Sequence, residues 1–207
     1  MGLAISPYHV VFKDFPTPES WPLDFKIDVF LARVDGWHLQ IADRCINGWQ
    51  DNEGRQCITA PHHSFITHQI PDAGWAVLQI VMNYFEIIGL FKFFRHSEAD
   101  DTFELFKQGV IDVFPEHESN KQTVKLLFAL RNGLYHQGVR GNNLYISGNE
   151  PKPLDYDSEE GQLKINPHLF VRRLREHFAE YAQSLRDPTQ TELRGKFKAA
   201  FYDYYAS

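Results

Sequence analysis

The chain has 207 residues, enough for one domain with a substantial core, and 43% of them are hydrophobic and 14% aromatic. This composition excludes a disordered chain. The formal net charge of −6 excludes nucleic-acid binding through a uniformly basic surface, so any such contact must use a local basic site.

Residues 1–72 are predicted to form an N-terminal arm, a first helix and a long loop, all packed on the core. Prolines cluster before residue 25 and indicate an irregular arm with a short strand at Tyr8–Phe12. Apolar residues recur every three or four positions from Asp24 to Asn47, which predicts an amphipathic helix. Glycine and proline interrupt the periodicity from Gly48 to Asp72 and indicate a loop or a small insertion.

Residues 73–94 form an apolar segment that is long enough to cross a bilayer. However, Gln79, Asn83 and Glu86 follow one another at helical spacing and place a polar stripe along this segment. A carboxylate in the middle of a membrane is strongly disfavoured, and no second span is present to shelter it. We therefore expect the central buried helix of a soluble bundle, with no membrane partner.

Four further helices and a hairpin complete the predicted fold. A helix at residues 101–114 is stopped by Pro115, and the next begins at a capping box, Ser119–Gln122, and ends near Gly138. Alternating apolar residues on either side of an acidic turn predict a β-hairpin at residues 141–166. Asn166-Pro167 opens one more helix and Asp187-Pro188 the last. The predicted fold class is therefore all-α: an up-and-down helical bundle, residues 73–207, with a small β-hairpin insertion.

The stretch Leu130–Gly138 places an arginine, an asparagine and a histidine in the closing turns of one helix. Asn132 and His136 are four positions apart and share a face. Arg131 is five positions from His136, yet a long side chain on the last turn can reach the same groove. A permanent cation beside an imidazole that titrates near neutral pH suits chemistry on a phosphodiester. The alternative is structural: Arg131 pairs with a carboxylate, and His136 interacts with the helix dipole.

Arg131-Asn132-x-x-x-His136, near the end of a bundle helix, resembles the R-x(4–6)-H signature of the HEPN superfamily, in which a polar residue often follows the arginine. The resemblance covers residues 73–186. It implies a HEPN-type bundle that forms a homodimer and brings two motifs into one cleft. Many members are metal-independent endoribonucleases of toxin–antitoxin, antiviral or RNA-processing systems.

Carried onto this chain, the resemblance implies roles for three catalytic residues. His136 would move protons at the RNA 2′-hydroxyl and the leaving 5′-oxygen. Arg131 would hold the scissile phosphate, and Asn132 would orient the phosphate or the imidazole. RNA is then the expected substrate, an antitoxin protein is a candidate partner, and no cofactor is expected. The second hypothesis is a non-catalytic HEPN-like module that binds RNA, a nucleotide or a protein partner.

Three more residues are candidates for supporting roles. Glu86, on the polar stripe of the central helix, can reach Arg131 or His136 and orient it; the alternative is a structural ion pair or a solvated stripe. Arg140 follows the helix and can add a phosphate contact, or it is an ordinary surface arginine. Tyr135 lines the cleft or packs in the core.

A metal site and an oxidising compartment both lack support in the sequence. His62, His63 and His68 form an HH-x4-H pattern that matches no standard zinc site, so we expect loop histidines and no metal. Cys45 and Cys57 form no CxxC pair, and reduced thiols are expected. The N-terminus has no basic segment followed by a long apolar run, so we expect no signal peptide and a cytoplasmic location.

Overall fold

The structure is a computed structural model that describes residues 3–6, 9–11, 18–47, 49–50, 56–57, 73–93, 102–136 and 143–206. Most residues within these ranges are helical, and one small three-stranded sheet lies between two of the helices in the sequence. The prediction of a mainly α-helical fold is therefore confirmed.

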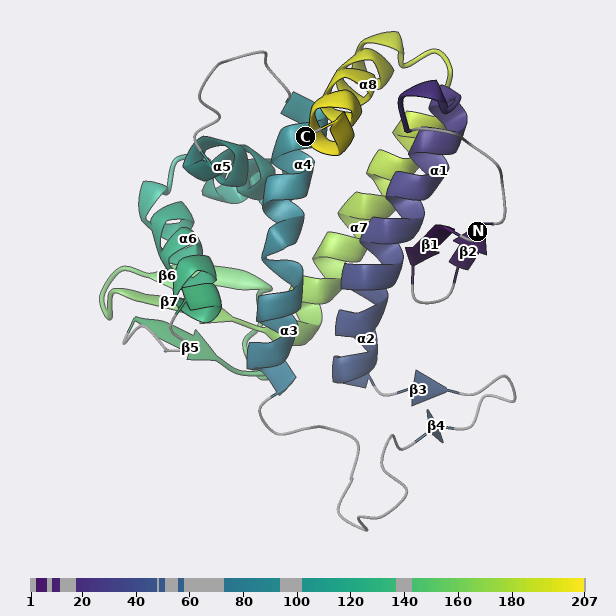
Figure 1. The fold of residues 1–207 in the computed structure, drawn as a ribbon. Helices are drawn as coiled ribbons and strands as arrows, with labels where there is room; N and C mark the ends of the chain where they lie inside the picture. The colour runs from purple at the N-terminus through teal and green to yellow at the C-terminus, as the bar shows by residue number, and fades with distance from the viewer. Residues whose placement is uncertain are drawn as a thin grey trace.

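Three helical rods lie side by side and form the body of the molecule (Figure 1). The first rod is α1 (Leu23–Val34), the π-helix η2 (Asp35–Leu39) and α2 (Gln40–Asn47). The second rod is α3 (Ala73–Val81) followed by α4 (Asn83–Phe93). The third rod is α7 (Pro167–Arg186). Each rod corresponds to a helix predicted from apolar periodicity.

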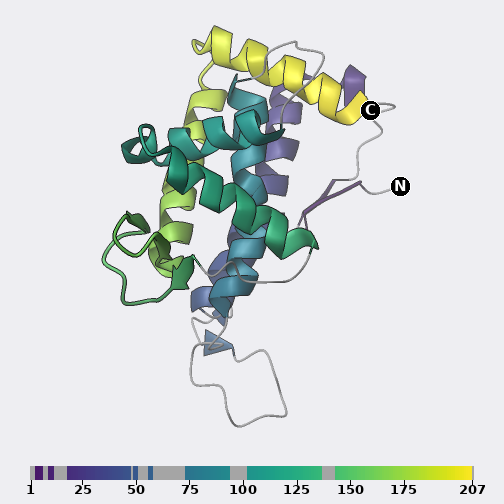
Figure 2. The same cartoon turned by 90° about the vertical axis from the view of Figure 1, so that its left-hand side faces the viewer.

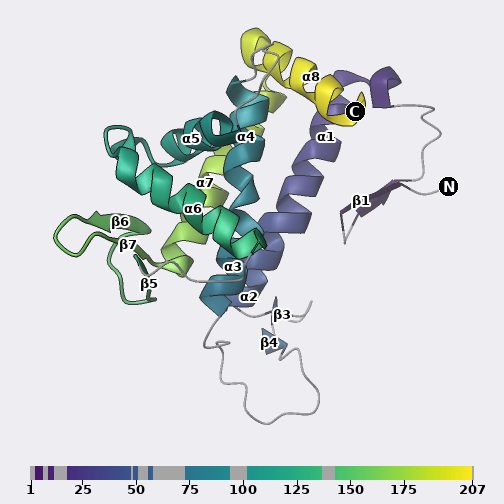
Figure 3. The same ribbon diagram turned by 60° about the vertical axis from the view of Figure 1, so that its left-hand side comes forward.

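The remaining helices run across these rods. Figure 2 shows α8 (Thr191–Ala206) lying over one end of the rods. The helices α5 (Thr102–Val113) and α6 (Lys121–His136) cover the second rod on the side away from α1, and the short 3-10 helix η3 (Pro115–His117) joins them (Figure 3). The first rod runs antiparallel to the second, because Phe30 packs on Phe91 and His38 bonds to Ile80. The second and third rods run in the same direction, because Gly74 lies beside Pro167 and Tyr84 beside His177. The expected up-and-down arrangement is therefore corrected for these two rods, and α5, α6 and α8 cross the rods (Figure 1).

Two of the rods contain an irregularity that the sequence pattern did not predict. The first rod passes through the π-helix η2, where one wide turn separates α1 from α2. The second rod is interrupted by a single turn residue, Met82.

The second rod is also the candidate for a membrane span. Among the described residues, Gly74–Phe93 is the one helical segment that is long and apolar enough to cross a membrane. Half of its most apolar window is buried in the fold, and Val77, Leu78 and Phe85 are inaccessible to solvent.

The hydrophobic core is continuous from the first rod to α8 and is rich in aromatic rings. Phe30 of α1 lies 4.5 Å from Phe91 of α4 and 5.2 Å from Phe197 of α8, between ring centroids. On the other side of α4, the ring of Phe85 lies 5.3 Å from that of Phe106 on α5. The first helix therefore packs directly on the bundle, as expected for residues 24–47.

Residues 143–165 form a sheet with a topology that differs from the predicted hairpin. Its strands are β5 (Leu144–Ile146), β6 (Leu154–Asp157) and β7 (Gln162–Ile165), in the order β5-β7-β6. The hairpin joins β6 and β7, and β5 pairs with β7 in parallel. The strand β6 was not predicted. Two aspartates, Asp155 and Asp157, alternate with its apolar residues, so its sequence resembles an acidic turn.

The structure confirms one of the predicted helix starts and corrects two others. The Asn166 side chain accepts hydrogen bonds from the backbone N–H groups of His168 and Leu169, and its amide donates to two carbonyls of the β5–β6 connection. At α6 the cap is Asn120, which accepts from the N–H groups of Gln122 and Thr123, in place of the predicted Ser119 box. Asp187 caps a turn, and α8 begins four residues later.

The N-terminal part adds two small antiparallel pairs. The strand expected near Tyr8–Phe12 is β2 (His9–Val11), and it pairs with β1 (Leu3–Ser6), which was not predicted. Within the predicted loop, β3 (Trp49–Gln50) pairs with β4 (Gln56–Cys57). Cys45 is a free thiol, and its burial raises the pKa of that thiol.

Candidate functional site

Helix α6 carries the predicted motif in its closing turns. Its apolar residues Val124, Leu127 and Leu130 are buried and fix the rotation of the helix against the core. This rotation leaves Arg131 and Asn132 half-buried at the boundary between the core and the solvent. The arginine of the motif is therefore held near the surface, with a fifth of its side chain exposed (20%).

Arg131 is fixed by two side chains. One terminal nitrogen, Nη2, lies 2.8 Å from Oε1 and 2.9 Å from Oε2 of Glu86 on α4. The other, Nη1, donates a 2.9 Å hydrogen bond to Oδ1 of Asn132. The structure thus brings together Glu86, Arg131 and Asn132, and the contact between Glu86 and Arg131 that the sequence allowed is present.

Burial shifts the titration of the Glu86 carboxyl. Partial burial raises its pKa above the usual value, and the charge and hydrogen bond of Arg131 offset this increase incompletely. The ionised carboxylate is therefore less well solvated in the fold than in water, and its stability in that form depends on the guanidinium. Removal of either partner leaves the other as an uncompensated charge at a half-buried position.

We expect a measurable coupling energy between these two side chains. In a double-mutant cycle with Glu86→Gln and Arg131→Gln, the coupling should be about 1 to 2 kcal/mol, because the pair is half-buried. The free energy of unfolding, from urea denaturation, gives the measurement. The exposed pair Glu104–Lys107 is the control, and its coupling should stay below about 0.5 kcal/mol. Equal coupling in the two pairs would contradict a structural linkage at Glu86.

The remaining motif residues are placed only in part. The backbone of α6 extends to His136. The side chains of Tyr135 and His136 and the whole of Arg140 lie outside the described residues. The approach of the imidazole to Arg131 therefore stays a prediction, as do the supporting roles of Tyr135 and Arg140.

A second polar cluster, which the sequence analysis missed, joins α4, α5 and α7. Lys92 Nζ lies 2.6 and 2.7 Å from the two carboxylate oxygens of Asp112. Asp112 Oδ2 also lies 2.7 Å from His177 Nε2, and His177 Nδ1 lies 2.7 Å from the hydroxyl of Tyr84. We call these four residues the Asp112 network. It passes from Lys92, which is 32% exposed, to the fully buried ring of Tyr84.

Each hydrogen bond of the Asp112 network can pair one donor with one acceptor. The N–H at Nε2 of His177 donates to the carboxylate, and Nδ1 accepts from the Tyr84 hydroxyl. Burial alone would raise the pKa of Asp112, but the hydrogen bonds from His177 and Lys92 outweigh it and lower that pKa. Burial and the charge of Asp112 raise the pKa of both Tyr84 and Tyr181.

The sequence contained one signal for this network. His177 falls on the apolar stripe of its helix, between Leu174 and Tyr181, where an imidazole needs a polar partner inside the fold. Nothing in the sequence identified Asp112 or Lys92 as that partner, because each lies on a different helix. Both nitrogens of His177 are satisfied and its side chain is 8% exposed, so the cluster is a structural element.

The described residues offer no group of three histidine, cysteine or acidic side chains that could hold a metal ion. His62, His63 and His68 lie outside the described residues. No family model, no curated protein and no solved structure matched this chain. The candidate site therefore consists of a guanidinium that a carboxylate and an amide orient, in the turns of α6 that lead to His136.

Proposed function

We propose that this chain is a cytoplasmic, metal-independent endoribonuclease of HEPN type that acts as a homodimer. Arg131, Asn132 and His136 would act on one phosphodiester of RNA. The proposal rests chiefly on Arg131, whose guanidinium is oriented by Glu86 and Asn132 at the end of the helix that carries His136. A toxin–antitoxin or defence system, with an antitoxin protein as partner, follows from the family resemblance.

Arg131 would bind the scissile phosphate. A guanidinium presents its donors in a planar fork that matches the oxygens of a phosphate. Because two neighbouring side chains hold it, little further ordering is required when the phosphate binds. Glu86 competes with the phosphate for this cation. Since burial raises the pKa of Glu86, its carboxylate can take up a proton and release the guanidinium more easily than an exposed one.

His136 would move the protons of the reaction. As a base, it takes the proton of the 2′-hydroxyl while the 2′-oxygen bonds to phosphorus. The bond from phosphorus to the 5′-oxygen breaks, and that oxygen receives a proton from a protonated imidazole. In a homodimer the second copy of His136 supplies this acid. The products are a 2′,3′-cyclic phosphate and a 5′-hydroxyl end, and a strand without 2′-hydroxyls is left intact.

The test is cleavage of single-stranded RNA by the purified chain in excess EDTA. We expect His136→Ala and Arg131→Ala each to lower the rate by about 100-fold or more, because each removes a group that acts in the transition state. Mass spectrometry of the products should find the cyclic phosphate. His168→Ala, a half-buried histidine at the start of α7, is the matched control and should cleave like the unaltered chain.

Two results would overturn the enzyme proposal. One is RNA cleavage that needs an added divalent cation. The other is cleavage that persists in both His136→Ala and Arg131→Ala, since a contaminating nuclease would behave in this way. DNA of the same sequence serves as the second control, because the proposed nucleophile is absent from it.

One observation favours the second function, a non-catalytic HEPN-like module that binds RNA, a nucleotide or a protein partner. The Arg131 guanidinium is already paired with Glu86 and is four-fifths buried, as expected for a structural ion pair. A module of this kind would bind RNA in the same assay without cutting it. Intact RNA together with measurable binding would therefore select this function over the enzyme.

A further inference from the structure

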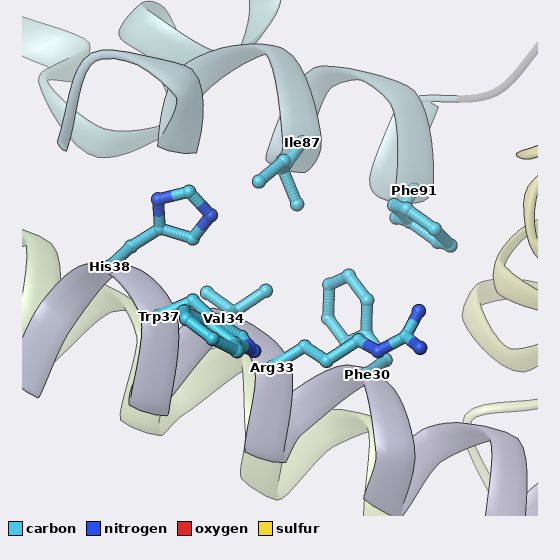
Figure 4. A pocket seen from close by; sticks show the side chains of 7 residues that line it. All are labelled: Phe30, Arg33, Val34, Trp37, His38, Ile87 and Phe91. Atoms are coloured by element: carbon cyan, nitrogen blue, oxygen red, sulfur yellow. The ribbon is translucent and has the colours of Figure 1, made fainter. Parts of the chain in front are cut away.

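A pocket of about 250 Å³ lies between the first rod and α4. Phe30, Arg33, Val34, Trp37 and His38 line it from α1 and the π-helix, and Ile87 and Phe91 line it from α4 (Figure 4). Pockets for drug-sized ligands usually enclose about 300 to 1,000 Å³. This pocket is therefore suited to a single planar ring system rather than to a larger ligand.

The π-helix gives the pocket its polar and aromatic wall. Trp37 and His38 both belong to η2, and irregular turns of this kind recur at functional sites. Trp37 is 48% exposed, and among the described residues only Tyr145 is a comparably exposed large apolar side chain. An exposed indole at the rim of an apolar pocket is a surface on which a base can stack.

His38 adds a hydrogen-bond acceptor. Its Nδ1 lies 3.1 Å from the carbonyl oxygen of Ile80, so this nitrogen carries the hydrogen and donates it. Burial lowers the pKa of His38, which keeps the ring neutral at neutral pH. Its Nε2 is then an acceptor, and Figure 4 shows this nitrogen turned toward the pocket. Every standard base carries an N–H donor on its pairing edge that can meet such an acceptor.

The pocket adjoins the ion pair of the candidate site. Ile87 in the pocket directly follows Glu86, so the two side chains leave α4 on adjacent faces, about 100° apart. Helix α6 contacts the same helix as the pocket, since Arg131 bonds to Glu86 of α4 and the pocket residues Ile87 and Phe91 also come from α4 (Figure 4). A strand whose phosphate contacts Arg131 would therefore bring a neighbouring base to this pocket.

We propose that the pocket binds one unpaired base of a single-stranded RNA, next to the phosphate that Arg131 holds. The base stacks on Trp37 and donates a hydrogen bond to His38 Nε2, and Arg33 contacts the adjoining phosphate. This inference rests on the proposed function for its substrate, but it concerns binding and specificity, not bond cleavage. It makes the chain selective for single-stranded regions, since a paired base cannot enter the pocket.

The test is binding of an end-labelled 2′-O-methyl oligonucleotide, followed by fluorescence anisotropy. Such a strand cannot be cleaved by the proposed reaction, because its 2′-oxygen carries no proton. We expect Trp37→Ala to weaken binding by about 5- to 160-fold, the range for loss of one stacked base. Trp37→Phe should retain most of the affinity. Tyr145→Ala removes a comparably exposed aromatic ring on β5 and should leave the affinity unchanged.

The possible results separate this inference from the proposed function. Binding that is equal in Trp37→Ala and the unaltered chain overturns the pocket inference, even if RNA is cleaved. Absence of binding by the unaltered chain also overturns it. Binding that depends on Trp37, in a chain that leaves natural RNA intact, supports the pocket and rejects the ribonuclease.

A second measurement needs no altered protein. A strand that carries 5-iodouracil can be crosslinked by ultraviolet light to an aromatic ring against which the base is stacked. We expect the crosslink to map to the peptide that contains Trp37. A crosslink found exclusively in other parts of the chain would overturn the inference.

Discussion

Replacement of Gly109 by alanine is expected to lower the free energy of unfolding by about 4 kcal/mol or more. Gly109 lies on α5 where this helix crosses α4, and an added Cβ would lie 2.0 Å from the carbonyl oxygen of Phe85 and 2.7 Å from its carbonyl carbon. These are backbone atoms and cannot turn aside. The two helices would have to separate, which is a stronger disturbance than the overpacking of side chains.

The close approach at this crossing is reciprocal. A Cβ on Gly89 of α4 would lie 2.0 Å from the carbonyl oxygen of Leu105 on α5, so each helix has a glycine against the backbone of the other. Separation of the helices would also pull apart Phe85 and Phe106, whose rings lie 5.3 Å apart in the core. Gly89→Ala should therefore have an effect of the same size.

Gly195 on α8 is the matched control for both substitutions. It is an exposed helical glycine, and an added Cβ would meet no atom within 4 Å. Gly195→Ala should increase stability by up to about 1 kcal/mol, because alanine is the better helix former. Urea and thermal denaturation, followed by circular dichroism, measure all three variants. A Gly109→Ala protein within about 1 kcal/mol of the unaltered chain would contradict this packing.

Most of the helices could be predicted because their periodicity reflects burial directly. The stripe that contains Phe30 and Val34 and the apolar run around Phe85 both belong to the core. The exceptions depend on contacts between distant segments. The π-helix at Asp35–Leu39 and the interruption at Met82 lie at neighbouring levels of two rods, where His38 bonds to the Ile80 carbonyl. No local pattern reveals such a contact.

The candidate site shows the same division. A polar stripe on an otherwise apolar helix pointed to Glu86, and a motif at a helix end pointed to Arg131 and Asn132, so these three residues could be found from the sequence. The parallel pairing of β5 with β7 and the Asp112 network could not, because both join residues whose neighbours in the sequence give no indication of a partner. The pocket beside Trp37 belongs to this second group, since it needs two rods to form.

Removal of the Asp112 carboxylate is the second change for which we expect a large loss of stability. Asp112→Ala leaves the ammonium of Lys92 and the N–H of His177 without their acceptor, and His177 is 8% exposed. Breaking a buried, hydrogen-bonded ion pair costs about 3 to 5 kcal/mol. Because Lys92 is 32% exposed and can regain water, we expect about 3 kcal/mol, at the lower end of that range.

Asp112→Asn removes the negative charge of this side chain but keeps its size, so it measures the contribution of the charge to stability. The amide keeps one acceptor oxygen, but its NH₂ group would face a donor, either Lys92 or the N–H of His177. We expect a loss of about 2 kcal/mol at pH 7, because one hydrogen bond and the charge attraction are removed. Asp155→Asn, in an exposed pair with Lys152, is the control and should change stability by less than about 0.5 kcal/mol.

The pH dependence gives this prediction a second, independent readout. The pKa of Asp112 is lower in the folded chain than its usual value of 3.8, so the unfolded chain binds the proton more readily. The stability that Asp112 contributes is therefore complete above pH 5 and decreases as the pH falls below about 4. The difference in free energy of unfolding between the unaltered chain and Asp112→Asn should be smaller at pH 3 than at pH 5. A difference that stays constant down to pH 3 would mean that the ionised carboxylate does not hold α5 to α4 and α7, and that packing alone accounts for their contact.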